Sequence, residues 1–349
     1  MTHKVIDLHC DSVYFLMEGR DLLRPVKDIH VDLPRLRKGG VALQVFAVYV
    51  PPNTESDKAF EYTSSRLDVI ESFIRSDGLL MAVETAVELK KALAEDKTGI
   101  MLAVENALAI ENSLEKLEQL RRRKVRIITL VHSQHMSWIS SSTGAGSFIS
   151  DSGESCGLSR FGEKVVDAMN DLGIIPDVSH SSENAFWDII KRSKKPVIAS
   201  HSCVYNICAA ARNLKDDQLK ALGDSGGLVG INFFSGFLNE IYRLQFDELL
   251  KKDPSIIEKA MYNRQALDIS IKVPFSDIAD HIDYIVKIAG EDNVALGSDF
   301  DGIPASPEGV TGSDFYPILE TELKSRGYSD KRIEKVFNAN FLRVLEAWD

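Results

Sequence analysis

Histidines and carboxylates recur in this sequence at one kind of position, which is the end of a short apolar run. His9 and Asp11 follow the first such run, and Glu105 ends a later one. The other members of the set are His132, His180, His201 and Asp299. Imidazole and carboxylate groups together bind hard-to-borderline divalent cations without any thiolate. Because a carboxylate such as Glu105 is costly to bury unless it is paired or binds metal, the set predicts a metal site.

The apolar runs predict the strands that carry these residues. They are short and rich in β-branched residues, which is typical of strands covered on both faces. The eight runs are 5–8, 41–48, 99–104, 125–131, 173–178, 196–200, 227–233 and 294–297. Amphipathic stretches alternate with them, so the chain is predicted to form an α/β fold, a (β/α)8 TIM-type barrel, in one domain over residues 1–349. A doubly wound open sheet is the alternative, although no G-x-G-x-x-G follows the first run.

Helices are predicted between the strands at four clear places. One begins near Asn112 or Ser113, and the others span 161–172, 277–289 and 330–345, the last as one helix or a pair. Two connections are long, 133–159 and 235–276, and the second contains helical material at 256–267. Both should lie at the C-terminal face of the barrel as lids or substrate walls. An oligomer contact is an equally weighted interpretation of the second.

In a barrel, all C-terminal strand ends face one cavity, so the site residues should converge. His9 and Asp11 are two positions apart and should share one face, with Cys10 pointing the other way. Asp301 has the same strand parity as Asp299, and Asp299 is favoured because it lies closer to the apolar run. The remaining histidines, predicted to be surface or loop residues, are His3, His30, His135 and His281.

This set of residue types predicts metal-assisted hydrolysis. Two metals about 3.5–4 Å apart can share a bridging carboxylate and a bridging hydroxide, and they polarise the scissile carbonyl. A free aspartate can then move a proton to the leaving amine while a histidine stabilises the oxyanion. The sequence has no G-x-S-x-G elbow, and nothing pairs a cysteine with a base as a nucleophile.

Composition limits the other possibilities. The 349 residues include 41 Lys and Arg against 52 Asp and Glu, a net charge of −11, which argues against nucleic-acid binding and suits a cation site. The four cysteines form no CxxC pair and are expected to be reduced, although a bridge from Cys156 stays open. No apolar stretch of about 18 residues and no signal peptide are evident, so we expect a cytoplasmic protein without a membrane span.

Several motifs together resemble the membrane (renal-type) dipeptidase family of metal-dependent amidohydrolase barrels. The resemblance runs over nearly the whole chain. Its motifs are Asp7-Leu8-His9-Cys10-Asp11, Gly39-Gly40-Val41 with residues 44–50, Gly157-Leu158-Ser159 with Phe161-Gly162, Asp177-Val178-Ser179-His180, residues 196–202, Ala211-Arg212-Asn213-Leu214, Gly230-Ile231-Asn232-Phe233 and residues 297–302.

The resemblance implies a zinc-dependent dipeptidase with two zinc ions and gives each residue a role. His9 and Asp11 resemble the ligands of one zinc, Glu105 the bridging carboxylate, and His180 and His201 the ligands of the second zinc. His132 resembles the histidine that contacts the substrate carbonyl. Arg212 resembles the arginine that binds the carboxylate of a free dipeptide, and Asp299 resembles the proton-transfer aspartate. The family often forms homodimers, so a homodimer is possible.

The chain departs from the family pattern at two places. It has Glu105-Asn106-Ala107 where the family commonly has Glu-Gly-Gly, and Asn338-Ala339-Asn340 where Gly-Gly-Asn is common. The first change lies beside the bridging carboxylate and puts the substrate range in doubt. Two alternatives to a dipeptidase therefore stay open. One is another metal-dependent hydrolase that opens a β-lactam or cleaves an N-acyl amino acid, and the other is an inactive metal-binding module.

Overall fold

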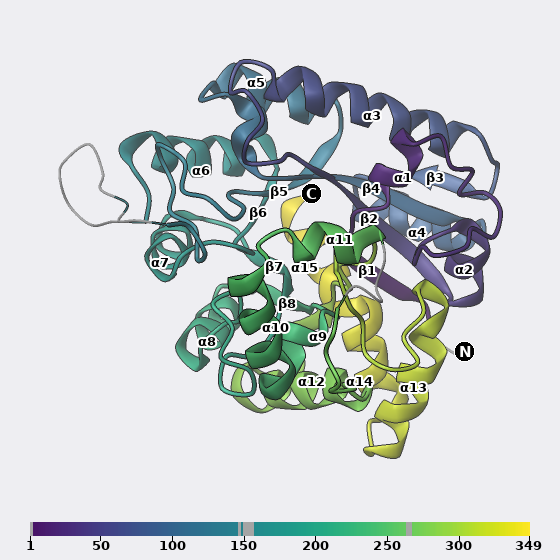
Figure 1. Cartoon of the computed structure of the whole chain (residues 1–349). Helices are drawn as coiled ribbons and strands as arrows, with labels where there is room; N and C mark the ends of the chain where they lie inside the picture. The colour runs from purple at the N-terminus through teal and green to yellow at the C-terminus, as the bar shows by residue number, and fades with distance from the viewer. Residues whose placement is uncertain (1–2, 146–147, 149–156, 263–266) are drawn as a thin grey trace.

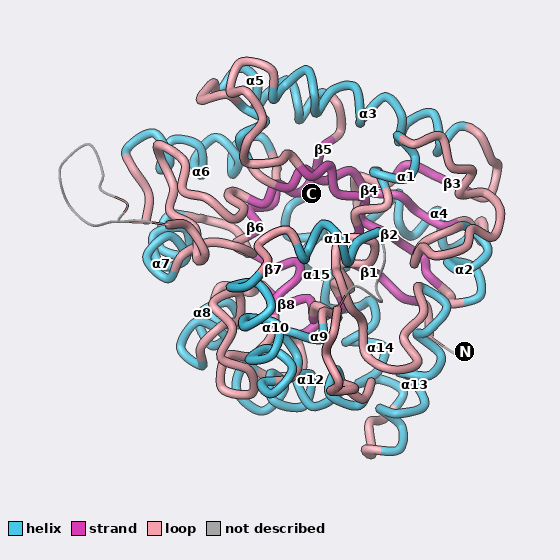
Figure 2. Tube along the Cα trace, in the orientation of Figure 1, coloured by secondary structure: helices cyan, strands magenta, loops and turns pink. Residues whose placement is uncertain are grey.

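The computed structural model describes residues 3–145, 148, 157–262 and 267–349 and shows a closed parallel β-barrel surrounded by helices (Figures 1 and 2). Eight strands close the barrel in the order β1, β2, β4, β5, β6, β7, β8, β9 and back to β1. The strands in this part of the chain are β1 (Val5–Cys10), β2 (Val41–Tyr49), β3 (Leu80–Ala82), β4 (Thr98–Glu105), β5 (Val125–Thr129), β6 (Ile175–Asp177), β7 (Ile198–Ser202), β8 (Leu228–Ile231) and β9 (Val294–Leu296). The predicted (β/α)8 barrel is confirmed.

Strand β3 was not predicted from the sequence. It is three residues long and pairs in parallel with only the first part of β4, from Thr98 to Ile100. The rest of that edge of β4, from Leu102 to Glu105, pairs with β5. A three-residue strand is too short to carry a recognisable alternation of apolar residues, and its place depends on the edge that β4 offers.

The helices fill the connections between strands. They are α1 (Val13–Met17), α2 (Leu33–Lys38), α3 (Ala59–Arg75), α4 (Ala86–Ala94), η1 (Ala107–Ile110), α5 (Leu114–Arg122), α6 (Arg160–Leu172), α7 (Glu183–Arg192), α8 (Asp216–Asp224), α9 (Ser235–Leu238), α10 (Glu240–Lys252), α11 (Ile256–Tyr262), α12 (Ser276–Ala289), η3 (Ser313–Phe315), α13 (Tyr316–Ser325), α14 (Asp330–Glu334), η4 (Lys335–Ala339) and α15 (Asn340–Trp348).

The predicted helices are present, and their ends have clear causes. The Ser113 side chain caps α5 by accepting from the Lys116 backbone N–H, as the sequence allowed. Helix α12 matches the prediction for 277–289, and α6 that for 161–172. The last predicted helix is divided into α14 and α15 by one turn of π-helix, η4. Of the helical material predicted at 256–267, α11 accounts for 256–262, and 263–266 lie outside the described residues.

Two hydrophobic clusters hold the barrel together. One lies between the strands and the surrounding helices, as with Val48 and Leu67. The other joins residues inside the barrel, such as Leu8 and Val45, to Phe341 and Trp348 of α15. Helix α15 therefore closes one end of the barrel, and it is visible through the centre of the ring in Figure 1. The opposite end is left for the site.

The long connection after β8 forms helices α9, α10 and α11. Phe237 of α9 lies over the guanidinium of Arg212, 5.6 Å from ring centroid to guanidinium carbon.

Within the described residues, no helix combines the length and apolarity needed to cross a membrane. Cys10, Cys203 and Cys208 are buried free thiols, and Cys156 lies outside the described part of the chain.

Of the histidines predicted to be surface or loop residues, His281 lies in a helix and is buried, so the prediction was wrong for it, whereas His30 lies in a loop as predicted but is also buried. His281 lies on the inner face of α12, where its ring accepts from the Val204 N–H at 3.0 Å and reaches the Leu238 carbonyl at 2.9 Å. His30 stacks on Phe300, and its Nδ1 accepts from the Asp301 N–H at 2.9 Å. Both rings satisfy backbone groups that lie far away in the sequence, a role that sequence position does not reveal.

Candidate metal centre and substrate pocket

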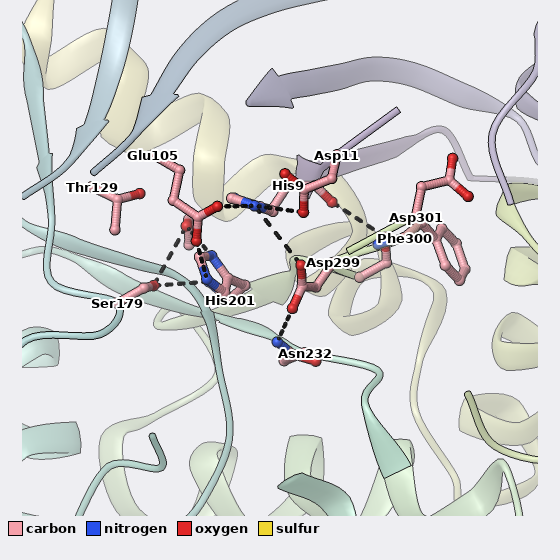
Figure 3. A network of polar contacts seen from close by, with 12 residues as sticks. His9, Asp11, Glu105, Thr129, Ser179, His201, Asn232, Asp299, Phe300 and Asp301 are labelled. Atoms are coloured by element: carbon pink, nitrogen blue, oxygen red, sulfur yellow. Dashed lines mark hydrogen bonds and ion pairs between the residues drawn. The ribbon is translucent and has the colours of Figure 1, made fainter. Parts of the chain in front are cut away.

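Five side chains meet at one end of the barrel, and they come from β1 and the residue after it, from β4 and β7, and from the segment after β6. Together with His132 and Asp299 they form three overlapping triads, and within each triad the ligand atoms lie within 4.8 Å of one another: His9, Glu105 and His201; Glu105, His132 and His180; and His9, Asp11 and Asp299. Glu105 lies in the middle, and its two carboxylate oxygens face different partners (Figure 3). The five residues are His9, Asp11, Glu105, His180 and His201, the set proposed as metal ligands from the sequence.

The first donor group comprises His9, Asp11 and the Oε2 atom of Glu105. His9 Nε2 lies 3.6 Å from Asp11 Oδ2 and 3.7 Å from Glu105 Oε2. The second donor group comprises His180, His201 and Glu105 Oε1. The Nε2 atoms of His180 and His201 lie 3.0 and 3.4 Å from that oxygen and 3.1 Å from each other. Two groups that share one carboxylate have the composition of a two-metal site.

Local backbone irregularities aim several of these side chains. The register of β1 against β2 shifts between Asp7 and Cys10, so the regular alternation of side chains is interrupted there. As a result, Asp7 accepts from the hydroxyl of Tyr316 in α13, whereas His9, two residues later, reaches Glu105. His180 and Asp299 have positive φ values of 68° and 60°. Such backbone strain is characteristic of functional sites, where the surrounding structure holds it.

The residues present fit a pair of cations. Within the described residues, His9 Nε2 and Asp11 Oδ1 are buried without a hydrogen-bond partner. Burial raises the pKa of Glu105 well above its usual range. Burial alone would lower the pKa of His9, but Glu105, Asp11 and Asp299 raise it to about 10. The cluster thus attracts positive charge, which metal ions would supply while also occupying the unpaired atoms.

The second donor group is prepared for a cation in a different way. Burial lowers the pKa of both His180 and His201 well below the usual range, and the charge of Arg212 adds to the effect. Both rings are therefore neutral, which is the form in which imidazole binds a metal.

His132 lies beside the second donor group, with its Nε2 atom 3.8 Å from Glu105 Oε1. Its ring packs against those of His180 and Tyr49, with centroid distances of 4.1 and 4.7 Å. Burial, together with the charges of Arg212 and His9, lowers the pKa of His132 to about 3. A neutral ring at this position can donate a hydrogen bond to a substrate oxygen.

Asp299 and Asp301 have very different surroundings, although the sequence made them rivals. Asp299 Oδ1 lies 3.8 Å from His9 Nε2, and its Oδ2 accepts from the Asn232 amide at 2.7 Å (Figure 3). Burial raises the pKa of Asp299 to about 7, although His9 opposes the shift. Asp301 instead accepts from the His30 N–H and the Ser12 hydroxyl, each at 2.6 Å. Of the two, only Asp299 faces the donor groups.

Arg212 is buried, whereas the sequence alone would have placed it at the surface. Its Nη2 donates to the His201 carbonyl at 3.0 Å, and its Nε has no hydrogen-bond partner among the described residues. Arg212 and His180 line the same cavity of about 340 Å³, together with Ser182, Tyr205 and Lys215. The cavity is therefore lined by a buried cation, Arg212, and by His180 of the second donor group.

Three contributing residues were assigned no role from the sequence. Asn232 holds Asp299, Tyr49 packs on His132, and Asp177 contacts Ser200 next to His201. A signal for Asp177 was available, because it is a carboxylate within a predicted buried strand, as Glu105 is. Asn232 and Tyr49 gave no comparable signal.

The substitution of Asn106 for the family's glycine has a local explanation. Its φ is 80°, a conformation that glycine adopts freely and asparagine tolerates better than most residues. Its amide donates to the Val50 carbonyl at 2.9 Å, and its Oδ1 accepts from the Leu108 N–H at 3.2 Å. Asn106 therefore links the end of β2 to η1. Asn338 and Ala339 lie in the π-helical turn η4.

Replacing Asn106 should separate its two contributions to stability. Asn106→Gly removes the side-chain hydrogen bonds but keeps the backbone relaxed, at a cost of about 1–2 kcal/mol. Asn106→Ala also strains the positive φ and should cost roughly 2–4 kcal/mol. Urea denaturation of the wild type and both variants provides the measurement. An alanine variant as stable as the glycine variant would contradict this account of the backbone.

A parallel barrel that gathers histidines and carboxylates at its C-terminal rim defines a metal-dependent hydrolase. The whole chain, residues 1–349, matches the membrane dipeptidase family, peptidase family M19, and it belongs to that family. An uncharacterised dipeptidase of Schizosaccharomyces pombe is 30% identical over 98% of this chain and 79% of its own length.

Solved structures agree with the fold. The chain resembles dipeptidase AC, an M19 metallopeptidase, with a TM-score of 0.83 and 25% identity over 100% of this chain and 99% of the other. It also resembles a metallopeptidase from Rhodobacter sphaeroides liganded with a phosphinate mimic of the dipeptide L-Ala-D-Ala. That similarity has a TM-score of 0.84 and 24% identity over the full length of both chains.

Proposed function

We propose that this protein is a dipeptidase that holds two divalent ions, with zinc favoured, and hydrolyses dipeptides with a free carboxylate. The observation that carries the proposal is that the two carboxylate oxygens of Glu105 face two different donor groups. A cavity lined by the buried Arg212 lies beside them. Nitrogen and oxygen ligands of this kind suit zinc. Membership of the dipeptidase family and the 30% identical relative named as a dipeptidase support the same function.

Each donor group would hold one ion, and Glu105 would bridge the two. When bound, the ions would polarise the scissile carbonyl and lower the pKa of the attacking water. His9 and Asp11 belong to the first group, and His180 and His201 to the second. The neutral rings of the second group need lose no proton to bind.

The remaining residues would transfer the proton, stabilise the negative charge on the carbonyl oxygen and bind the substrate's carboxylate. Asn232 restrains one oxygen of Asp299 and leaves the other facing the site, where it can carry a proton to the leaving amine. His132, held neutral, donates a hydrogen bond to the carbonyl oxygen as negative charge develops on it. Arg212 binds the substrate carboxylate in the cavity, with its unpaired Nε available as a donor.

The metal content tests the binuclear site directly. Protein purified without chelator and then reconstituted with zinc should contain two ions per chain, because two sets of ligands share one carboxylate. Elemental analysis after removal of unbound metal is the measurement. A reproducible value of one or none after reconstitution would rule out two metals. A chelated sample should lose hydrolysis and regain it with zinc.

Turnover of a dipeptide library by metal-analysed protein tests the activity itself. Hydrolysis of free dipeptides with release of both amino acids is the expected result. Two loaded ions without dipeptide turnover, but with hydrolysis of a β-lactam or an N-acyl amino acid, would instead identify the broader hydrolase.

A further inference from the structure

Asp177 is a fully buried carboxylate at the end of β6 that has no place in the function described so far. Its Oδ1 accepts from the backbone N–H groups of Ser179 and Ser200 at 2.9 and 2.8 Å. Its Oδ2 accepts from the hydroxyls of Thr129 and Ser200 at 2.6 and 2.5 Å. These bonds tie β5 and β7 to β6 immediately below the second donor group.

The Ser200 hydroxyl also lies 2.8 Å from Nδ1 of His201. A hydroxyl has one proton to donate, and both oxygens of Asp177 accept in the hydrogen bonds just described. Ser200 therefore donates to Asp177, and the same oxygen accepts from His201 Nδ1–H. The alternative acceptor, Ser179 Oγ, is farther away at 3.4 Å and already accepts from the His201 backbone N–H at 3.1 Å. Each hydrogen bond therefore has one direction: His201 donates to Ser200, and Ser200 donates to Asp177.

We propose that Asp177 is a positioning residue that sets the tautomer of His201 through Ser200. With the proton held on Nδ1, the lone pair of Nε2 is directed at Glu105 and His180, where a cation would lie. Hydrogen bonds of this kind commonly fix the tautomer and orientation of metal-binding histidines. The inference rests on the proposed two-metal function, in which His201 belongs to the second donor group.

Asp177→Asn tests the direction of the hydrogen bonds from His201 through Ser200 to Asp177, because asparagine has nearly the same size as aspartate. The amide oxygen can keep the two backbone hydrogen bonds, which places the NH2 group towards Ser200 and Thr129. Ser200 then accepts from this NH2, and its own proton is free to turn to His201 Nδ1, which at 2.8 Å is closer than Ser179 Oγ at 3.4 Å. This hydrogen bond favours the Nε2–H form of the His201 ring, in which a proton covers the nitrogen that faces Glu105.

The first measurement is the tautomer of His201 in metal-free protein, from ¹⁵N chemical shifts of histidine-labelled samples. The expected result is Nδ1–H in the wild type and Nε2–H in Asp177→Asn. An unchanged tautomer in the folded variant would overturn the proposal. This readout needs neither metal nor substrate, so it is independent of whether the protein is a dipeptidase.

The second measurement is zinc affinity, from competition with a chromophoric chelator. Asp177→Asn should weaken binding of one of the two ions by roughly 10–100-fold and leave the other unchanged. Thr129→Val is the matched control, because it removes one hydrogen bond to Asp177 and leaves Ser200 in place; its affinities should be those of the wild type. If the wild type itself binds only one ion, the two-metal function fails. If Asp177→Asn binds both ions normally, only this inference fails.

A double variant guards against an unspecific effect of the buried substitution. Ser200→Ala removes the group through which Asp177 acts, so adding Asp177→Asn to it should change zinc affinity little further. Equal losses from Asp177→Asn with and without Ser200 would show a general structural defect and overturn the proposal. If Asp177→Asn does not fold, Ser200→Ala alone should still weaken one ion, and normal binding of both ions by that variant would also overturn it.

Discussion

Asp299→Asn is expected to keep both metal ions and to lose turnover by a factor on the order of 10²–10⁴, the usual contribution of a general acid–base group. The structure gives the physical reason. One oxygen of Asp299 is held by Asn232 and the other faces His9 across 3.8 Å. An amide retains the size and the polar contact, but it cannot carry a proton between water and the leaving amine.

Asp301→Asn is the matched control for that experiment. Asp301 is a carboxylate that is more fully buried than Asp299, and its oxygens accept from Ser12 and from the His30 backbone. Its replacement should lower thermal stability and leave kcat close to the wild-type value. Steady-state kinetics and elemental analysis of both variants provide the comparison. If Asp299→Asn turned over normally and Asp301→Asn did not, the assignment of the proton-transfer residue would be wrong.

Arg212→Ala is expected to lower kcat/KM for a free dipeptide. The decrease should correspond to a loss of roughly 2–5 kcal/mol of transition-state stabilisation. A dipeptide ends close to its scissile bond, so one fixed cation can hold its carboxylate while the carbonyl lies at the metal centre. A guanidinium binds a carboxylate through two parallel hydrogen bonds. Because Arg212 is buried, this ion pair would be shielded from water and stronger than one at the surface.

The decisive comparison uses a dipeptide and its C-terminal amide. Wild-type protein should prefer the free acid, and Arg212→Ala should lose most of that preference because the group that recognises the charge is gone. Lys215→Ala is the control, since Lys215 lines the same cavity but is exposed and paired with Glu183 at 2.6 Å. That variant should keep the preference. Equal rates on acid and amide by the wild type would contradict the dipeptidase function.

The sequence by itself determined the barrel and the approximate place of the site. Eight buried runs alternating with amphipathic stretches leave few other ways to bury both faces of the strands. Once the strands are parallel and closed, their C-terminal ends must meet, which is why His9, Glu105 and His201 could be expected together. The family's pattern added Arg212, which the spacing of residues could not have revealed.

Other features depended on tertiary structure, because they arise from contacts between residues far apart in the chain. The parity of Asp299 and Asp301 is the same, and it is the contact of Asp301 with His30, 271 positions away, that separates them. The register shift in β1 accompanies the different neighbours of Asp7 and His9, although regular alternation would place both on one face. Contacts between distant residues also explain why His30 and His281 are buried. They explain as well the hydrogen bonds that join Asp177 through Ser200 to His201. Local pattern reports which residues must be buried, but only the packed barrel decides which partner each buried polar group finds.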